Sequence, residues 1–251
     1  GDYMKKISFI GAGSVQFTTS VVNDIITYPA LDDCEICLMD INEERLQIIT
    51  NCVRRIKNEL NSNITITSTT SREEALTGAD AVVVTVFNGD VEVFEKEIEI
   101  PMKYGVDINV GDTRSVSGIF RALRNIPLLL DICKDIERIC PNAFMLNYTN
   151  PMAMLCKAMQ TYTNVDVTGL CHSVQHTSKM LSDWVGADYS KVKYTCVGIN
   201  HLAFFTELRE GDKDLYPFLR EKIKEEEYYN YEKVRNEIFK TFGYYVTESS
   251  G

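Results

Sequence analysis

A pair of glycines between an apolar segment and a helical segment constrains the fold of this chain more than any other feature. Gly11-Ala12-Gly13 follows the short apolar segment 6–10 and precedes segment 15–28, which has helical character and stops near Pro29. Glycines at such a junction permit a tight turn between a strand and a helix. The sequence therefore predicts a chain that opens with a β-strand, a glycine turn and an α-helix.

The same alternation continues through the first half of the chain. Short apolar runs between turn residues predict buried strands, and apolar residues at steps of three and four predict amphipathic helices. The predicted strands are 6–10, 35–39, 81–86, 143–146 and 165–169, and the predicted helices are 15–28, 43–60 and 121–140. Such alternation indicates a parallel sheet with right-handed crossovers. We therefore expect an α/β fold with a Rossmann-type, dehydrogenase-like domain over residues 4–170.

A change of pattern after residue 166 predicts a second domain over residues 171–251. This part is expected to be the start of an α/β (α+β) domain that binds substrate and metal. The elements predicted there are strands at 192–197 and 203–209, a turn at 198–201 between them, and a charged helix with a solvated face at 221–239. Residues 1–3 precede Met4 and are interpreted as an expression remnant, and we expect the natural chain to continue past Gly251.

The composition of the 251 residues excludes several classes of partner. A formal net charge of −10 argues against nucleic acid or an anionic membrane surface, because either would need a basic patch. No apolar run approaches the roughly 20 residues that span a bilayer, and no signal peptide is recognised. The 8 cysteines are scattered, which indicates reduced thiols and a cytoplasmic protein. Cys34 and Cys37 have the spacing of a redox or zinc pair, but they enter a predicted buried strand and are interpreted as packing residues.

The residues around the glycine turn have the pattern of a dinucleotide site. Gly11 permits the turn, and Gly13 lets the backbone approach a pyrophosphate whose charge the helix N-terminus favours. Ser14 can donate to phosphate, and Asp40 ends the second strand, where a carboxylate accepts from ribose hydroxyls and disfavours a 2′-phosphate. These features favour NAD over NADP. Gln16 replaces the third glycine of the G-x-G-x-x-G pattern, and the alternative interpretation is a glycine turn plus an N-capping acid.

A cysteine and a histidine follow two predicted strands in the second half of the chain. Cys171 follows strand 165–169, and the carboxyl edge of an open parallel sheet faces the ligand crevice. His201 follows strand 192–197. A thiolate and an imidazole form half of a first-row metal site and leave positions for water or substrate oxygens. From spacing alone, a buried small cysteine and a satisfied turn histidine are the more ordinary interpretation.

Amide side chains end another predicted strand, in the segment Asn147-Tyr148-Thr149-Asn150-Pro151. Amides at this edge suit sugar hydroxyls or a nicotinamide, which makes Asn147 a candidate cofactor residue and Asn150 a candidate substrate residue. Asn150 before a proline is pushed to an extended conformation, and the alternative for it is a cap on a helix starting near Met152. Asp112, in Gly111-Asp112-Thr113, is a candidate substrate residue, with a solvated turn as the alternative.

Four motifs together resemble one enzyme family. In order they are Gly-x-Gly-Ser at 11–14, Asn-Tyr-Thr-Asn-Pro at 147–151, Gly-Leu-Cys-His-Ser-Val at 169–174 and Gly-x-Asn-His at 198–201. They resemble glycoside hydrolase family four over essentially the whole chain. Cys-His-Ser-Val resembles the α-galactosidase branch, and an α-galacturonidase has a similar motif.

The resemblance implies an unusual glycosidase, which departs from the two-carboxylate mechanism of most such enzymes. It implies transient oxidation of the sugar at C3 by NAD, followed by removal of the C2 proton with help from a metal that acts as a Lewis acid. The aglycone is then eliminated, water adds, and the hydride returns to C3. The net reaction is hydrolysis of an α-galactoside. The resemblance also implies a homo-oligomer, a dimer or a tetramer.

On this resemblance, Cys171 and His201 hold manganese(II), and Asn150 binds sugar hydroxyls. His172 is the candidate acid for the leaving group, because an imidazole titrates near neutral pH, and an exposed spectator is the alternative. The base at C2 is expected to be Tyr244 or Tyr245, or a residue beyond Gly251. Two rival functions stay open: a 2-hydroxyacid dehydrogenase, which would form NADH without a metal, and a redox-sensing NAD-binding subunit without turnover.

Overall fold

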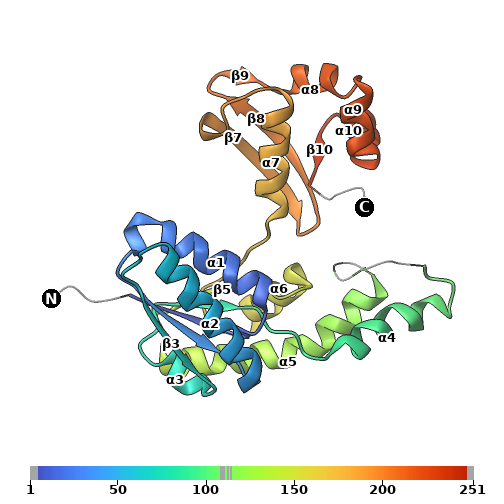
Figure 1. The fold of residues 1–251 in the computed structure, drawn as a ribbon. Helices are drawn as coiled ribbons and strands as arrows, with labels where there is room; N and C mark the ends of the chain where they lie inside the picture. The colour runs from blue at the N-terminus through green and yellow to red at the C-terminus, as the bar shows by residue number, and fades with distance from the viewer. Residues whose placement is uncertain (1–4, 108–110, 112, 114, 248–251) are drawn as a thin grey trace. The chain divides into compact units, whose positions relative to one another are not determined.

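The computed structural model describes residues 5–107, 111, 113 and 115–247 (Figure 1). The chain divides into two compact units, Gly1–Leu170 and Cys171–Gly251. Each unit has its own sheet and its own apolar core. Within the described residues, no helix is both long enough and apolar enough to cross a membrane.

Unit 1 contains a six-stranded parallel sheet in the order β3-β2-β1-β4-β5-β6. In the sheet, Phe9 lies beside Leu38 on one side and Val83 on the other. The strand order runs outward in both directions from β1 and β4, and ligands of such sheets bind at that point, outside the carboxyl ends of the strands. The predicted Rossmann-type fold is therefore confirmed. The strands are β1 (Lys6–Ile10), β2 (Glu35–Met39), β3 (Thr65–Thr69), β4 (Ala81–Val84), β5 (Phe144–Asn147) and β6 (Val167–Gly169).

Helices cover both faces of this sheet (Figure 1). α1 (Val15–Thr27) and α2 (Glu43–Glu59) pack with one face, while α3 (Arg72–Leu76), α5 (Val116–Ile139) and α6 (Met152–Tyr162) pack with the other. Because both faces are buried, β4 is apolar at every position. Each fully buried Val, Leu or Ile side chain contributes about 1.5–3 kcal/mol. This core fixes the carboxyl ends of β1, β2 and β5, which are followed by Gly11, Asp40 and Asn150 of the predicted sites.

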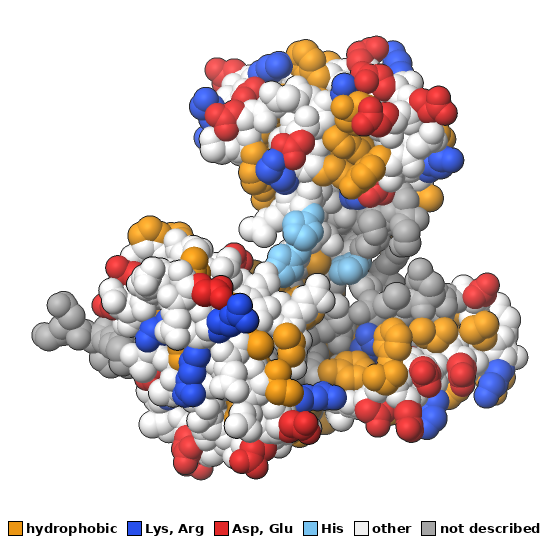
Figure 2. All heavy atoms as spheres, in the orientation of Figure 1, with side chains coloured by type: hydrophobic (Ala, Val, Ile, Leu, Met, Phe, Trp, Pro, Cys, Tyr) orange, Lys and Arg blue, Asp and Glu red, His pale blue; other side chains and the backbone are white. Residues whose placement is uncertain are grey.

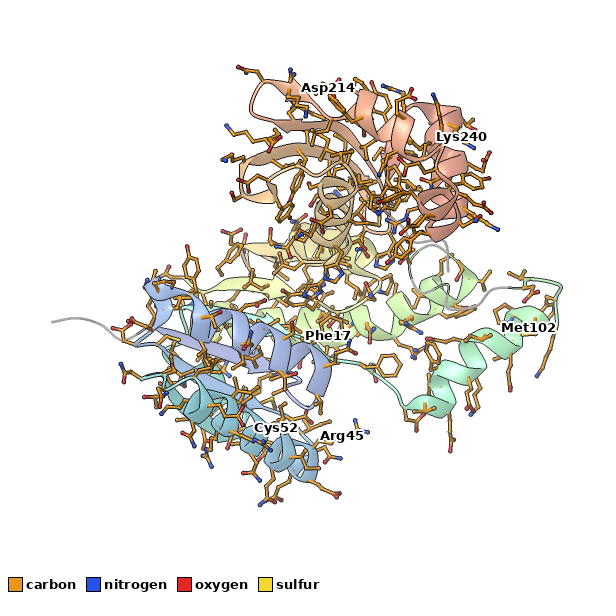
Figure 3. The ribbon with its side chains drawn as sticks, turned by 45° about the horizontal axis from the view of Figure 1, so that its top comes forward. Phe17, Arg45, Cys52, Met102, Asp214 and Lys240 are labelled. Atoms are coloured by element: carbon orange, nitrogen blue, oxygen red, sulfur yellow. The ribbon has the colours of Figure 1, made fainter. Side chains whose placement is uncertain are left out.

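α4 (Val91–Met102) and the first half of α5 form a helical hairpin in unit 1. Between the two helices, the buried carboxylate of Glu97 pairs with the guanidinium groups of Arg121 and Arg124. A carboxylate buried without such partners would cost several kcal/mol, so the pairs make this burial possible. Exposed hydrophobic side chains lie on both helices of the hairpin (Figure 2), and Met102 lies at the end of α4 (Figure 3).

Unit 2 has a small antiparallel sheet in the order β10-β8-β7, with β9 paired to β8. Its core joins this sheet to α7 and α8 through Leu181, Phe205, Leu219 and Tyr245. The strands are β7 (Val192–Ile199), β8 (Leu202–Glu210), β9 (Lys213–Asp214) and β10 (Tyr245–Val246); the helices are α7 (Ser173–Trp184), α8 (Tyr216–Lys222), α9 (Glu226–Tyr231) and α10 (Lys233–Phe242); and short 3₁₀ turns are η1 (Pro29–Leu31) and η2 (Tyr189–Lys191).

Some predicted elements differ from the structure. The single charged helix over 221–239 is wrong, because that segment is divided among α8, α9 and α10. It is not a purely solvated face either: Arg235, Asn236 and Phe239 of α10 are buried, and Asn236 donates to the carbonyls of Tyr228 and Tyr229. Tertiary packing therefore overrides the charge pattern there. α5 also begins earlier than predicted, at a Ser115 side chain that caps the amide of Gly118.

Candidate cofactor and metal sites

The glycine turn after β1 is held by hydrogen bonds to the neighbouring strands. The amides of Gly11 and Ala12 both donate to the carbonyl of Met39, at 3.0 and 2.9 Å, and the Thr85 hydroxyl donates to the Gly11 carbonyl at 2.8 Å. Gly11 has a φ of 86°, and a Cβ at this position would come within 2.9 Å of the Thr85 carbonyl oxygen. A side chain here would be strained by both its backbone and its neighbours.

Asp40, at the end of β2, is tied to the same turn. Its Oδ2 accepts from the Gly13 amide at 2.8 Å and its Oδ1 accepts from the Asn42 amide at 2.9 Å. A Cβ on Gly13 would lie 2.6 Å from this Oδ2, so only glycine permits the contact. Each carboxylate oxygen has a second lone pair, which leaves Asp40 able to accept from ribose hydroxyls.

The start of α1 completes the surroundings of this turn. Ser14 is the N-cap of α1, yet its hydroxyl makes no capping bond to the helix. First-turn amides and an uncommitted hydroxyl are the donors that a pyrophosphate takes at a helix N-terminus. The glycines, the serine and Asp40 therefore fit a dinucleotide: Gly11 and Gly13 have no side chains, Ala12 between them is buried, and donors and acceptor lie at the carboxyl ends of β1 and β2.

The two predicted amides after β5 have different surroundings. Asn147 is fully buried; its Oδ1 accepts from the Thr149 amide, and its Nδ2 donates to the Thr149 carbonyl. These bonds make Asn147 part of the turn itself. Asn150 is half-buried, precedes Pro151 through a cis peptide bond, and accepts at Oδ1 from the Met152 amide at 3.3 Å. Among the described residues no partner lies within hydrogen-bond distance of the Asn150 Nδ2.

The Asn150 Oδ1 is used by the first amide of α6, although the N-cap of that helix is Pro151 rather than Asn150. The capping alternative is therefore only partly matched. The Asn150 Nδ2 is a group that could donate to an oxygen of a ligand.

In unit 2 the fold brings Cys171 and His201 together. Cys171 precedes α7, and His201 lies in the turn between β7 and β8 with a φ of 57°. The Cys171 Sγ lies 3.6 Å from the His201 Nε2. Ser173 faces the same sulfur, with its hydroxyl at 3.3 Å and its amide at 3.5 Å. The pairing expected from sequence is thus present within one unit.

The electrostatics of this pair favour a thiolate. Burial by itself raises the pKa of Cys171, but hydrogen bonds from His201 and Ser173 outweigh it and lower the pKa from 9.0 to about 7. Burial instead raises the pKa of the Cys34, Cys37, Cys133, Cys140, Cys156 and Cys196 thiols. A ready thiolate beside an imidazole fits a divalent first-row metal ion. The described residues contain no group of three or more metal-ligating side chains. Cys171 and His201 could supply two ligands of a metal site, with the other positions open to water or substrate.

Asn200, beside His201, adds a second sign of a polar ligand. Its Oδ1 is inaccessible to solvent and has no hydrogen-bond partner among the described residues. A buried acceptor without a partner costs about 1–3 kcal/mol. A donor or a metal ion bound near the β7–β8 turn would remove that cost.

The remaining predicted residues differ in accessibility. His172 is half-buried before α7, with its ring 5.6 Å from that of His176. Tyr244 is 47% exposed, whereas Tyr245 is fully buried and its hydroxyl donates to the Asn236 Oδ1. Burial also raises the pKa of Tyr245, so it is suited to the core rather than to proton removal. Asp112 lies outside the described residues.

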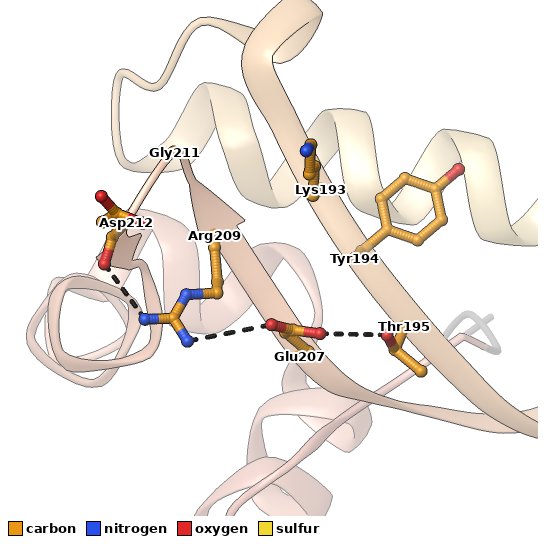
Figure 4. Close-up of a pocket in the computed structure, with 7 residues that line it drawn as sticks. All are labelled: Lys193, Tyr194, Thr195, Glu207, Arg209, Gly211 and Asp212. Carbon is orange, nitrogen blue, oxygen red and sulfur yellow. Dashed lines mark hydrogen bonds and ion pairs between the residues drawn. The ribbon is translucent and has the colours of Figure 1, made fainter.

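A surface pocket on the β7–β8 sheet contains none of the predicted site residues (Figure 4). Arg209 donates to the Asp212 carbonyl and pairs with Glu207, and the Thr195 hydroxyl donates to the same carboxylate. These groups therefore bond to one another across the exposed strands.

Sequence reasoning missed two residues that shape the sites. Ser173 was present in the Cys-His-Ser-Val motif, but only the structure shows its contact with the cysteine sulfur. Asn125, in the interior of α5, gave no sequence signal, yet it is fully buried and bonds to the segments that follow β4 and β5.

Two family models match the chain. The family 4 glycosyl hydrolase model matches residues 6–187, and the model of the C-terminal domain of family 4 glycosyl hydrolases matches residues 196–251.

Individual proteins are similar over most of the chain. An alpha-galactosidase of Bacillus subtilis (strain 168) is 41% identical over 249 residues, which cover 98% of this chain and 58% of that protein. An alpha-galacturonidase of Thermoanaerobacter italicus (strain DSM 9252 / Ab9) is 30% identical over 259 residues, 95% of this chain and 56% of that protein. The 6-phospho-beta glucosidase from Thermotoga maritima, solved with manganese, NAD+ and glucose-6-phosphate, is 25% identical with a TM-score of 0.78, over 87% of this chain and 53% of that chain.

This chain thus spans just over half the length of each of these three proteins. The four motifs, the Rossmann-type sheet and the two family models agree. The chain belongs to the family 4 glycosyl hydrolases.

Proposed function

We propose that the protein containing this chain hydrolyses α-galactosides and depends on NAD and manganese(II). The observation that carries this proposal is the Cys171–His201 pair, which gives a metal-ligating thiolate and imidazole to a chain whose other unit is built like a dinucleotide-binding domain. The rival 2-hydroxyacid dehydrogenase needs no such pair. The choice of galactoside is supported by the 41% identity with an alpha-galactosidase.

In unit 1, the groups that would hold NAD are those of the glycine turn. Gly11 and Gly13 keep the turn free of side chains, and the Ser14 hydroxyl and the first amides of α1 would donate to the pyrophosphate. Asp40 would accept from ribose hydroxyls and repel a 2′-phosphate. Asn147 would contribute to the cofactor site by holding the turn after β5, because its own amide is bonded within the chain.

In unit 2, Cys171 and His201 would hold the metal ion, and Ser173 would support the thiolate. When bound, NAD supplies a hydride acceptor and manganese(II) a Lewis acid. Side chains of this chain would bind the sugar and move the protons. Asn150 would donate through Nδ2 to a sugar hydroxyl, His172 would protonate the leaving oxygen, and the exposed Tyr244 would be the base at C2. Asp112 stays a candidate substrate residue.

The thiolate ligand also bears on where the enzyme works. A low-pKa thiol is readily oxidised, so we place the protein in the reducing cytoplasm. Its partner is a small glycoside, and we expect a homo-oligomer. An α-galacturonidase is the alternative within the family, supported by the 30% identical relative.

The test is hydrolysis of aryl α-galactoside and aryl α-galacturonide by the full-length protein, omitting NAD, manganese(II) and thiol reductant in turn. We expect galactoside hydrolysis that each omission abolishes, without net NADH formation. Hydrolysis of the galacturonide alone would move the assignment to the alternative. NADH formation from a 2-hydroxy acid, without hydrolysis, would overturn the proposal.

A further inference from the structure

We infer that Asn125 is a positioning residue, which acts on the substrate through Asn150 by joining the two turns that follow β4 and β5. The inference rests on the proposed role of Asn150 as a donor to the sugar.

Asn125 lies in the middle of α5 and has no exposed surface. Its Oδ1 accepts from the Asn88 amide at 3.2 Å, and its Nδ2 donates to the Asn150 carbonyl at 3.2 Å. One buried side chain thus uses its acceptor on the segment after β4 and its donor on the segment after β5. Buried amides that are bonded in this way fix the groups they bridge, because either bond once broken leaves an unpaired polar group.

The Asn88 side of this bridge is itself firmly attached to α5. The Asn88 Nδ2 donates to the Arg124 carbonyl at 2.9 Å, and the Arg124 Nε donates to the Asn88 carbonyl at 3.3 Å. The Arg124 guanidinium is anchored in turn by the buried Glu97. The segment after β4 is therefore held by α5 at three points, and Asn125 is the point that continues to Asn150.

The Asn150 side is where function would be affected. Its Oδ1 is bonded to the Met152 amide, so the direction of its Nδ2 is set by the backbone of this turn. The Asn125 bond to the Asn150 carbonyl holds that backbone from the other side. If the bond is lost, the turn gains freedom and the Nδ2 donor is no longer aimed at one position. A misplaced donor weakens binding of the sugar without touching the reacting atoms.

The matched test uses Asn125→Asp in the full-length protein. The carboxylate keeps the shape and the acceptor for Asn88 but replaces the donor to Asn150 with a second acceptor. We expect KM for the aryl α-galactoside to rise by about 10-fold with kcat nearly unchanged, since binding in the ground and transition states falls equally. The Kd of NAD, measured by calorimetry, should change by less than about 2-fold.

Two comparisons separate positioning from lost stability. Ser8→Ala removes another buried bond of the same sheet, from the Ser8 hydroxyl to the Ala75 carbonyl, and should lower Tm without changing KM. Asn150→Ala should raise KM, and Asn125→Asp added to it should raise KM no further, because Asn125 acts through Asn150. Additive effects on KM, or an Asn125→Asp variant that loses only Tm, would overturn the inference.

Hydrogen exchange separates this inference from the proposed function. In Asn125→Asp, the Met152 amide should exchange at least about 10-fold faster than in the wild type, whatever sugar the enzyme takes. Faster exchange in a protein that hydrolyses no glycoside would leave the positioning role in place and remove the glycosidase assignment. Unchanged exchange in an active enzyme would remove the positioning role alone.

Discussion

Replacing His201 should make the Cys171 thiol a weaker acid, and the effect is measurable without substrate or cofactor. His201 has a φ of 57°, a backbone conformation that asparagine tolerates better than most residues, so His201→Asn is the least disruptive change. The substitution removes the ring nitrogen 3.6 Å from the sulfur while burial, which raises the pKa, stays. The thiol pKa should therefore rise from about 7 toward 9.0.

The size of the effect follows from this shift. A fall of the pKa from 9.0 to about 7 corresponds to about 3 kcal/mol in favour of the thiolate. At pH 7 about half of the thiol is then ionised, and a rise of the pKa by one unit leaves about a tenth. Because the thiolate is the nucleophile, alkylation of Cys171 at pH 7 should slow by about 5-fold, and by about 50-fold if the whole shift is lost.

The assay is the pH dependence of alkylation by iodoacetamide in chelator-treated protein, read by mass spectrometry of the peptide that contains Cys171. His176→Asn makes the same chemical change at an exposed histidine and should leave the profile unchanged. An apparent pKa near 9 in the wild type, or the same pKa in wild type and His201→Asn, would refute the reasoning.

Three further predictions concern stability and cofactor binding. The folded-state pKa of Cys171 lies below its unfolded value, so the stabilising effect of the thiolate is complete above pH 9 and is lost as the pH falls toward 7. In metal-free protein, the difference in free energy of unfolding between wild type and Cys171→Ser should therefore change by about 2 kcal/mol from pH 7 to pH 9 in denaturant titrations. A difference that stays the same over this range would contradict the shift. Gly13→Ala would place a Cβ 2.6 Å from the Asp40 Oδ2. The Kd of NAD, measured by calorimetry, should therefore rise by at least about 10-fold. An unchanged Kd would show that the turn does not hold the cofactor. Tyr245→Phe removes only the hydrogen bond to Asn236 and should lower the free energy of unfolding by about 1 kcal/mol. The pH profile of hydrolysis should stay unchanged. Loss of activity in a variant of native stability would instead identify Tyr245 as the base.

The sheet of unit 1 could be predicted because its signals are local. Continuous apolar runs, such as β4, and the glycine turn after β1 each restrict the backbone without help from distant residues. β3 (Thr65–Thr69) escaped prediction because its threonine-rich sequence lacks an apolar run, and its place is set by pairing with β2. The division of the 221–239 segment could likewise not be predicted, because it depends on the burial of α10, and the charged residues of α10 give no sign of that burial.

The candidate sites show the same limit. The types of residue in the Cys171–His201 pair were predicted, since few side chains bind first-row metal ions. Their 3.6 Å separation and the support from Ser173 depend on how α7 and the β7–β8 turn meet. The burial of Tyr245 was not evident beside Tyr244, because the two are adjacent tyrosines and only Tyr245 belongs to the two-residue strand β10. Asn125 could not be found, because an asparagine inside an amphipathic helix has no local signature for a bridge between two distant turns.

Hydrolysis of an aryl α-galactoside in D₂O by the full-length enzyme tests the central claim most directly. A mechanism that removes the C2 proton should return deuterium at C2 of the released galactose, which proton NMR detects as loss of the C2–H signal. Hydrolysis through two carboxylates leaves the C2–H bond untouched. Deuterium at C2, dependent on both NAD and manganese(II), is the result we predict; galactose that keeps its C2 proton while hydrolysis proceeds without NAD would contradict the account.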